Sequence, residues 1–263
     1  MKTRREIIKA GAGVAAILAT GRAPAAIVRS MLGARSAITA KKSGGGGGGW
    51  TNPYSTNGLT HFWDGEWNVA GGEHDASATT WADLVGNINL ALNGSASFGS
   101  NYMETTDESS GAISDAAISA AYLEIVFVNT YSTTGWYSLI DDLSNVWLWC
   151  EPKWLSAHSE GLSVVYWGKM NTLADGMTNL IALRLALDGS VARANNVDMT
   201  EEGPAEEHGL GAFSIFGNVD NIGEAGCCQG RCYSCRIYSS IPTAAERAAN
   251  YAVDVARFGL PTA

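Results

Sequence analysis

The sequence predicts an all-β fold, a single β-sandwich that carries one short helix at its C-terminal end. Glycine occurs 31 times and tryptophan nine times, whereas proline occurs only six times. Long runs of charged, helix-forming residues are missing, and short apolar stretches alternate with turn residues instead. A chain of 263 residues is long enough for one large sandwich. One hydrophobic core therefore accounts for the composition.

The strands are predicted by runs of β-branched and aromatic residues that end at turn residues. In residues 121–129 both alternating sets of side chains are largely apolar, one beginning at Tyr122 and the other at Leu123, which is typical of a buried strand. A hairpin turn is expected at 187–190, where Asp-Gly supplies the positive φ that a tight reversal needs. The other expected strands are 59–64, 88–92, 137–141, 146–151, 162–167, 179–187, 211–217 and 231–238.

The C-terminal helix is specified by its ends. Thr243 is the expected N-cap, and Glu246 occupies the third helical position, so the two form a capping box. Gly259 and Pro261 stop the helix, because glycine favours the C′ position and proline cannot continue a helix.

Residues 1–43 differ from the rest of the chain. They hold nine of the 17 Lys and Arg residues and a single acid. The segment Thr3–Lys9 is similar to a twin-arginine export motif, and a weakly apolar run and a small-residue site at 23–25 follow it. The same residues also fit a retained helical arm, since Thr3 and Glu6 form a capping box. The segment is therefore either an export signal or an N-terminal helical arm.

The six glycines of 44–49 are expected to form a flexible linker, so that the globular domain comprises residues 50–263. No transmembrane span is expected, because the apolar run is far shorter than the roughly 20 residues that a bilayer crossing needs. Residues 44–263 contain eight basic and 25 acidic residues. A surface with this charge repels phosphate, so nucleic acid is not expected as a partner.

Four of the five cysteines are clustered, at 227, 228, 232 and 235. Cys232 and Cys235 could supply half of a zinc site, but free cysteine also packs as a small apolar residue. We favour core packing or a disulfide over a metal site. In an exported protein a bridge within the cluster would leave Cys150 as the unpaired thiol.

Two parts of the chain resemble the laminin-G-like, concanavalin A-type lectin and glucanase jelly roll. One comprises Phe62–Gly65 and the Asp-x-x-Gly-Asn turn within Trp81–Asn87, and the other comprises Arg236–Tyr238 and the capped segment Thr243–Glu246. Together they bracket nearly the whole body of the chain. The resemblance implies a jelly-roll β-sandwich with a short C-terminal helix and a helical N-terminal segment. It implies no single activity, because jelly rolls of this type serve lectins, adhesion modules, carbohydrase appendages and phage-tail parts.

Some members of this superfamily hold Ca²⁺ at the rim of the sandwich, where several oxygen ligands converge. The resemblance implies Asp83 and Asn87 as the candidate calcium ligands in this chain. The alternative is that both residues stabilise the turn through hydrogen bonds to their own backbone, which requires no ion.

No catalytic motif is present in the sequence. Glucanases of this architecture use Glu-x-Asp-x-Glu on one strand, and no such run occurs here. A nucleophile elbow, a His-Glu-x-x-His motif and a phosphate-binding glycine loop are missing as well. The acidic clusters around Glu104 and Glu201 are interpreted as solvated loops. The chain is therefore not expected to be an enzyme.

Four tryptophans are the candidate ligand-binding residues. In the stretch 146–151 alternation places Trp147 and Trp149 on one face, and an outer face with two indole rings could stack on sugar rings. Trp154 and Trp167 could extend this platform. The alternative is that these tryptophans pack inside the sandwich.

The function expected from these features is that of a non-catalytic, lectin-like module that binds carbohydrate or surface glycans at or outside the cell surface. The alternative is a structural or adhesion component of a surface or phage-tail-like assembly, anchored through its N-terminal helix, in a cytoplasmic or particle-associated setting. The sequence does not identify the ligand, the oligomeric state or the processing of the N-terminus.

Overall fold

The computed structural model describes residues 50–107, 110–114, 116–129, 137–142, 147–151, 154–158, 165–169, 178–184, 192–199, 201–202, 211–217 and 228–262. All of them belong to one compact unit, Lys42–Ala263. For the strands between 147 and 169 it describes the backbone alone. The predicted signal or helical arm at 1–43, the linker and the turn at 187–190 lie outside the described residues.

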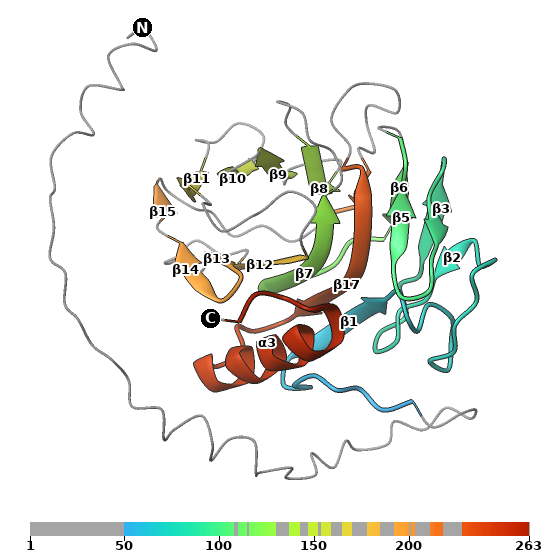
Figure 1. Ribbon diagram of the computed structural model, residues 1–263, viewed down its shortest axis with the longest axis horizontal. Coiled ribbons are helices and arrows are strands. Elements are labelled where there is room, and N and C mark those ends of the chain that lie inside the picture. Colours follow the sequence, from blue (N-terminus) through green and yellow to red (C-terminus); the bar gives the residue numbers. More distant parts are fainter. Residues whose placement is uncertain are drawn as a thin grey trace, which may run out of the picture. The chain divides into compact units, whose positions relative to one another are not determined.

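The fold is an all-β sandwich of two antiparallel sheets with one helix packed outside it, which confirms the predicted fold class (Figure 1). The first sheet has the order β14-β13-β12-β7-β17-β5-β4, and β1 pairs with β17 as well. Its strands are β1 (Leu59–Asp64), β4 (Ser97–Phe98), β5 (Met103–Thr105), β7 (Tyr122–Asn129), β12 (Asn179–Arg184), β13 (Ala192–Ala194), β14 (Val197–Met199) and β17 (Gly230–Tyr238).

The second sheet has the order β15-β11-β10-β9-β8-β16-β6-β3-β2. Its strands are β2 (Thr80–Trp81), β3 (Leu90–Asn93), β6 (Gly111–Ser114), β8 (Tyr137–Asp142), β9 (Trp147–Glu151), β10 (Trp154–His158), β11 (Val165–Lys169), β15 (Glu201–Glu202) and β16 (Phe213–Ile215).

Most of the described strands of four or more residues were predicted, but β6 and β10 were not; of the shorter described strands, only β16 lies within a predicted strand, 211–217. The predicted strand 59–64 coincides with β1, and β7 and β17 differ from their predictions by one residue at the N-terminal end. The strand predicted at 162–167 is shifted, since β11 begins at Val165. The interpretation of Glu104 and Glu201 as loop residues is wrong, because they lie in β5 and β15. Strands of two or three residues are too short to show periodicity in the sequence.

Strand β17 connects distant parts of the first sheet. Along one side it pairs with β7. Along the other side its first residues, from Gly230 to Cys232, pair with β5, and its residues from Ser234 to Tyr238 pair with β1. The C-terminal strand thus holds the first strand of the domain in place, which explains why the two resembling segments bracket the body of the chain.

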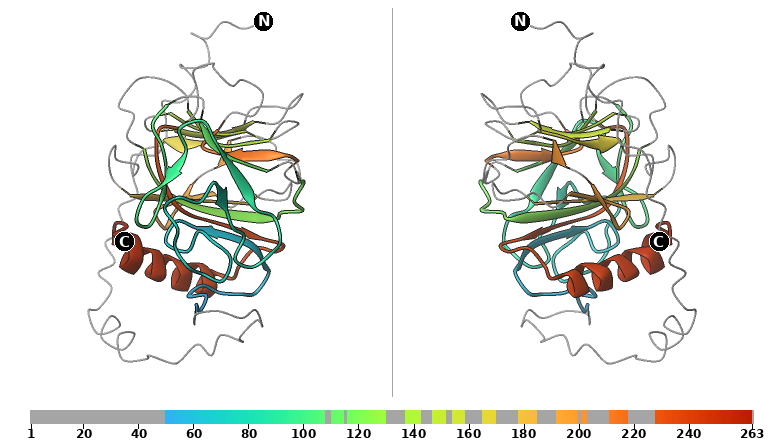
Figure 2. Two further views of the ribbon diagram at one scale, coloured as in Figure 1. Left: turned by 90° about the vertical axis from the view of Figure 1, so that its right-hand side faces the viewer. Right: turned by 90° about the vertical axis from the view of Figure 1, so that its left-hand side faces the viewer.

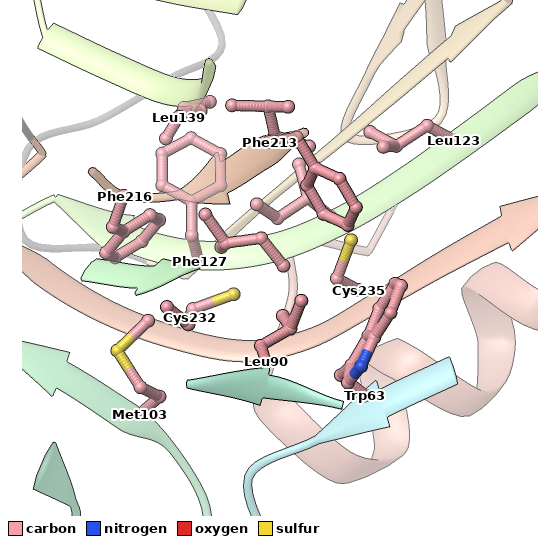
Figure 3. Close-up of a cluster of buried hydrophobic side chains, with 14 of the residues drawn as sticks. Trp63, Leu90, Met103, Leu123, Phe127, Leu139, Phe213, Phe216, Cys232 and Cys235 are labelled. Atoms are coloured by element: carbon pink, nitrogen blue, oxygen red, sulfur yellow. The ribbon is translucent and has the colours of Figure 1, made fainter. Parts of the chain in front are cut away.

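The main hydrophobic core lies between the two sheets (Figure 3). Leu123 and Phe127 of β7 contribute from the first sheet, and Leu139 of β8 and Phe213 of β16 contribute from the second. The Trp63 and Phe213 rings meet edge to face across the sheets, with centroids 5.9 Å apart. Each such side chain contributes about 1.5–3 kcal/mol by leaving water.

A second core lies on the opposite face of the first sheet, beneath helix α3 (Ala244–Phe258) (Figure 2). Tyr122 and Val126 of β7 belong to it, so the second apolar face of this strand is covered by the helix. The predicted capping box of Thr243 and Glu246 is confirmed. No helix in the described part of the chain is long and apolar enough to cross a bilayer.

The cysteine cluster belongs to the main core. Cys228, Cys232 and Cys235 are fully buried and pack with the apolar side chains of both sheets, and Figure 3 shows Cys232 and Cys235 there. This confirms the interpretation that these residues are core residues. Cys227 and the Cys150 side chain lie outside the described part of the chain.

Candidate functional site

The outer face of the first sheet carries a row of charged residues that crosses four strands. Arg193 of β13 is paired with Ala182 of β12, which is paired with Glu124 of β7, and Glu124 is paired with Arg236 of β17. Residues that are directly opposite one another in antiparallel strands share a face. The row therefore lies on the face that α3 covers.

Arg236 is the centre of a buried ion-pair network beneath α3. Its Nη1 and Nη2 donate to the two carboxylate oxygens of Asp254 at 2.8 and 2.6 Å, and its Nε donates to Glu124 Oε2 at 3.0 Å. Arg236 and Asp254 are completely buried, and Glu124 is 3% exposed. The guanidinium also stacks 3.9 Å from the Tyr54 ring centroid. Such a network requires full compensation of its charges, because burying an unpaired charge is costly.

Neighbouring polar groups complete this network. The Asn250 amide donates to the Tyr238 hydroxyl at 2.9 Å and to Glu124 at 3.3 Å, and Tyr238 donates to Glu124 at 3.3 Å. Burial raises the pKa of Glu124, an effect that the nearby Arg236 charge opposes. All three donors bind the same oxygen of Glu124, Oε2, and the network holds the helix on the sheet.

A pocket opens beside this network, between the N-terminal half of α3 and strands β7, β12 and β13. The space in and in front of it is about 220 Å³, but most of this is open solvent, and the enclosed part is about as large as one water molecule. The pocket forms at Ala182, because the side chain of this residue is small and lies between the larger side chains of Arg193 and Glu124 on the two neighbouring strands. We call it the Tyr122 pocket; it is lined by Tyr122, Glu124, Leu180, Ala182, Arg193, Asn196, Arg247 and Tyr251.

The turn between β13 and β14 brings Asn196 to the pocket. Asn195 and Asn196 both have positive φ, 46° and 67°, as a tight hairpin turn requires. Arg193 Nη2 donates to the Asn196 carbonyl and to its side-chain oxygen, at 2.9 and 2.7 Å. The hairpin therefore fixes one of the two guanidinium groups that line the pocket.

Among the buried donors of the pocket, the Tyr122 hydroxyl and Arg247 Nε have no hydrogen-bond partner within the described residues. The Arg247 Nη1 donates to the Pro242 carbonyl at 2.6 Å. Burial raises the pKa of Tyr122, and the nearby Glu124 carboxylate adds to this, so the phenol keeps its proton. Both atoms are donors, and each buried donor without a partner costs about 1–3 kcal/mol. The pocket is therefore suited to a ligand group that accepts hydrogen bonds.

The predicted calcium ligand Asp83 is a turn residue whose oxygens are both engaged. Its Oδ1 accepts the backbone N–H groups of Phe62, Val85 and Gly86 at 2.8–3.1 Å. Its Oδ2 accepts the N–H of Ile88 at 3.1 Å and lies 2.6 Å from His61 Nδ1. Asp83 thus makes the hydrogen bonds that are expected of a residue that stabilises its own turn.

Asn87, the second predicted calcium ligand, is exposed in the same turn. Within the described residues no group of three or more His, Cys, Asp or Glu side chains could hold a metal ion. Calcium binding by Asp83 and Asn87 stays a prediction.

The four predicted ligand-binding tryptophans lie on three neighbouring strands of the second sheet. Trp147 and Trp149 are in β9, Trp154 begins β10, and Trp167 is in β11. Trp149 is opposite Ser156 of β10, and Trp167 is opposite Leu155. Their side chains lie outside the part of the chain that the structure describes, so a tryptophan platform stays a prediction.

The residues of the Tyr122 pocket were not predicted as a site. Two features of the sequence point to them in retrospect: Glu124 interrupts an otherwise largely apolar buried strand, and Arg236 lies between the apolar residues Cys235 and Ile237 in β17. A buried strand with one charged residue indicates a partner of opposite charge. The contribution of Arg193, Ala182 and Arg247 depends on the strand register and on the docking of the helix.

Comparison with known proteins shows the fold. No protein-family model matches the sequence, and no curated protein matches it. The structure of the Trypanosoma rangeli sialidase in complex with sialic acid matches with a TM-score of 0.58 at 11% identity, over 76% of this chain and 33% of that one. The chain thus spans about a third of the length of the sialidase.

Two further structures are similar. Domain 4 of AbnA, a GH43 extracellular arabinanase from Geobacillus stearothermophilus, in complex with arabinotriose, matches with a TM-score of 0.54 at 14% identity, over 74% of this chain and 98% of that domain. The crystal structure of a mutant of HCR/D matches with a TM-score of 0.57 at 10% identity, over 78% of this chain and 55% of that one.

Proposed function

We propose that this chain is a non-catalytic carbohydrate-binding module of the laminin-G-like, concanavalin A-type jelly-roll class. The observation that carries the proposal is the Tyr122 pocket, which combines the Tyr251 ring, two guanidinium groups and an amide in one concave site. Sugar sites combine an apolar or aromatic surface with a few fixed polar groups that orient hydroxyls. The pocket has this composition.

The likeness of fold supports the same proposal. This chain matches nearly the whole length of the arabinanase domain, whose structure was solved with arabinotriose. The sialidase structure was solved with sialic acid. Because a fold by itself does not establish an activity, the pocket remains the main argument.

The arrangement of the carboxylates favours binding over hydrolysis. A retaining glycosidase needs two carboxyl groups about 5–5.5 Å apart, one of which acts as a general acid. Glu124 is the one carboxylate among the described residues that line the pocket, and its Oε2 already accepts hydrogen bonds from Arg236, Tyr238 and Asn250. We propose that the module releases no sugar from the glycans that it binds.

The proposed location is the cell surface or the exterior, reached through the export signal proposed for residues 1–43. N-terminal sequencing of protein expressed in its native host tests this. A mature N-terminus close to Ala26 supports export, whereas an intact Met1 in a large particle favours the structural alternative.

A glycan array probed with the intact chain, with and without Ca²⁺, tests the binding function. We expect binding to a restricted set of glycans, and no reducing sugar released from a polysaccharide panel. Ala182→Val, which fills the pocket, should weaken that binding. A Trp147→Ala, Trp149→Ala double variant tests the predicted platform in the same assay. The absence of binding to any glycan would overturn the proposed function.

A further inference from the structure

We propose that the Tyr122 pocket is a subsite for a carboxylate group and that, on the function proposed above, its ligand is an acidic sugar such as a hexuronic acid. The carboxylate would lie between the Tyr122 hydroxyl and Arg247, and the sugar ring would extend toward the mouth of the pocket. This assigns a class of ligand to the site.

The charge of Arg247 favours an anionic ligand. Residues 44–263 carry eight basic residues against 25 acidic ones, so cations on this body are scarce. Arg231 is paired with Glu104 at 2.9 Å, and Arg236 with Glu124 and Asp254.

Arg257 is likewise paired with Asp64 and Glu66. Arg247 instead donates its Nη1 to a backbone carbonyl, and it has no carboxylate partner among the described residues. An arginine that is half-buried without a counter-ion, in so acidic a protein, is suited to an anionic ligand.

The buried donors of the pocket need hydrogen-bond acceptors. The Tyr122 hydroxyl belongs to a side chain with no exposed surface, and neither it nor Arg247 Nε has an acceptor in the part of the chain that the structure describes. A carboxylate offers two acceptor oxygens and no donor, so it can satisfy both. A sugar hydroxyl could accept one of these bonds but would leave the Arg247 charge without a counter-ion.

The Glu124 carboxylate makes the pocket better suited to a carboxylate ligand than to a phosphate. Glu124 lines the same pocket, and although Arg236 compensates its charge, a nearby anion is still repelled. A carboxylate carries one negative charge, whereas a phosphate monoester carries nearly two at neutral pH. The pocket therefore favours the singly charged group.

Both donor atoms are covered in this structure, so a carboxylate reaches them only when side chains at the edge of the pocket move. The two arginines at its edge, Arg193 and Arg247, are half-buried, and long side chains of this kind often change rotamer on binding. The floor is formed by Ala182, Leu180 and Tyr122 in the rigid first sheet. The donor on the sheet is thus fixed, and the donor on the helix can adjust.

The test is an NMR titration of the intact chain with glucuronate, glucose, acetate and inorganic phosphate at constant ionic strength. We expect glucuronate, and more weakly acetate, to shift backbone amide signals near Tyr122, Asn196 and Arg247, while glucose does not. Tyr122→Phe, which keeps the ring and removes the hydroxyl, should weaken glucuronate binding about tenfold or more. Arg247→Gln and Ala182→Val should do the same.

The matched control is Arg231→Gln, which removes an arginine on the same sheet away from the pocket and should leave the affinity unchanged. Thermal unfolding of each variant checks that the fold is retained. The carboxylate subsite is refuted if glucose binds as well as glucuronate, if phosphate binds more tightly, or if Tyr122→Phe and Ala182→Val both bind glucuronate as the wild type does.

The outcomes separate this inference from the proposed function. Binding of neutral glycans on the array without any glucuronate shift in the pocket would overturn the subsite and leave the binding module intact. Conversely, pocket shifts with acetate and glucuronate in a protein that binds no glycan would support the subsite and overturn the carbohydrate-binding function.

Discussion

Arg236 shows how a single residue can hold two elements together in this protein. It is completely buried, and it neutralises a carboxylate from the sheet, Glu124, and one from the helix, Asp254. Arg231 on the same strand makes a different kind of pair, since its side chain is 41% exposed and its partner Glu104 is 30% exposed. Buried and exposed pairs of the same chemistry differ in their effect on stability, because water and salt screen the exposed one.

Replacing Arg236 by Met should lower the free energy of unfolding by about 3–5 kcal/mol, because it leaves Glu124 and Asp254 buried without a counter-ion. The control Arg231→Met should cost about 0–1 kcal/mol, since it breaks only a surface pair. Urea unfolding of both variants measures the difference. Equal losses in the two variants would contradict a stabilising role for the buried network.

At the scale of the element, the turn between β2 and β3 depends on Asp83. Burial by itself raises the pKa of this carboxyl group, but the hydrogen bonds from His61 and from the N–H groups of Gly86, Phe62 and Ile88 outweigh burial, and the net pKa is lowered. These bonds tie the turn to β1, because His61 and Phe62 belong to that strand. The turn is thus held by ionised Asp83.

The stability that Asp83 contributes should therefore depend on pH. The folded-state pKa lies below the ordinary value of about 3.9, so as the pH falls the unfolded chain takes up the proton first. The contribution is complete above roughly pH 5, and it is lost as the pH falls through the folded-state pKa. The difference in unfolding free energy between wild type and Asp83→Asn should be largest near neutral pH and shrink below about pH 4. A difference that does not change with pH would show that Asp83 acts in another way.

At the scale of the whole molecule, the first sheet has a core on each face. The second sheet covers one face, and α3 covers the other (Figure 2). The three described cysteines lie in the core between the sheets, and burial raises the pKa of Cys232 well above its usual value and that of Cys235 to about 12. Their thiols report on the integrity of the sandwich, because they reach solvent only when the two sheets separate.

In the folded protein, Cys232 and Cys235 should not react with iodoacetamide. Labelling requires a thiolate that the reagent can reach. Burial keeps both thiols protonated and away from solvent. Mass spectrometry of labelled peptides should show modification in denaturant and almost none in native buffer over the same time. Rapid labelling of native protein would show that the sheets open locally at this point.

The parts of the fold that the sequence predicted are specified locally. Strand β1 and the central strand β7 are long enough for their apolar pattern to be recognised, and the Thr243–Glu246 box needs only three residues of spacing. The turn-stabilising alternative for Asp83 is also local, since its partners Val85, Gly86 and Ile88 follow it closely.

The sequence by itself therefore determined an all-β chain with a capped C-terminal helix, and it left open whether the clustered cysteines pack or pair and whether Asp83 binds calcium or stabilises its turn. Only the tertiary structure decided where Glu124, Ala182, Arg193 and Arg247 meet, because strand register joins Glu124 to Ala182 and helix docking brings Arg247 to Arg193, and each of these two pairs is more than 50 positions apart in the sequence. No periodicity in a sequence records which strands become neighbours. The Tyr122 pocket exists because a small residue of β12 lies between charged residues of its two neighbouring strands, and α3 closes the space above it.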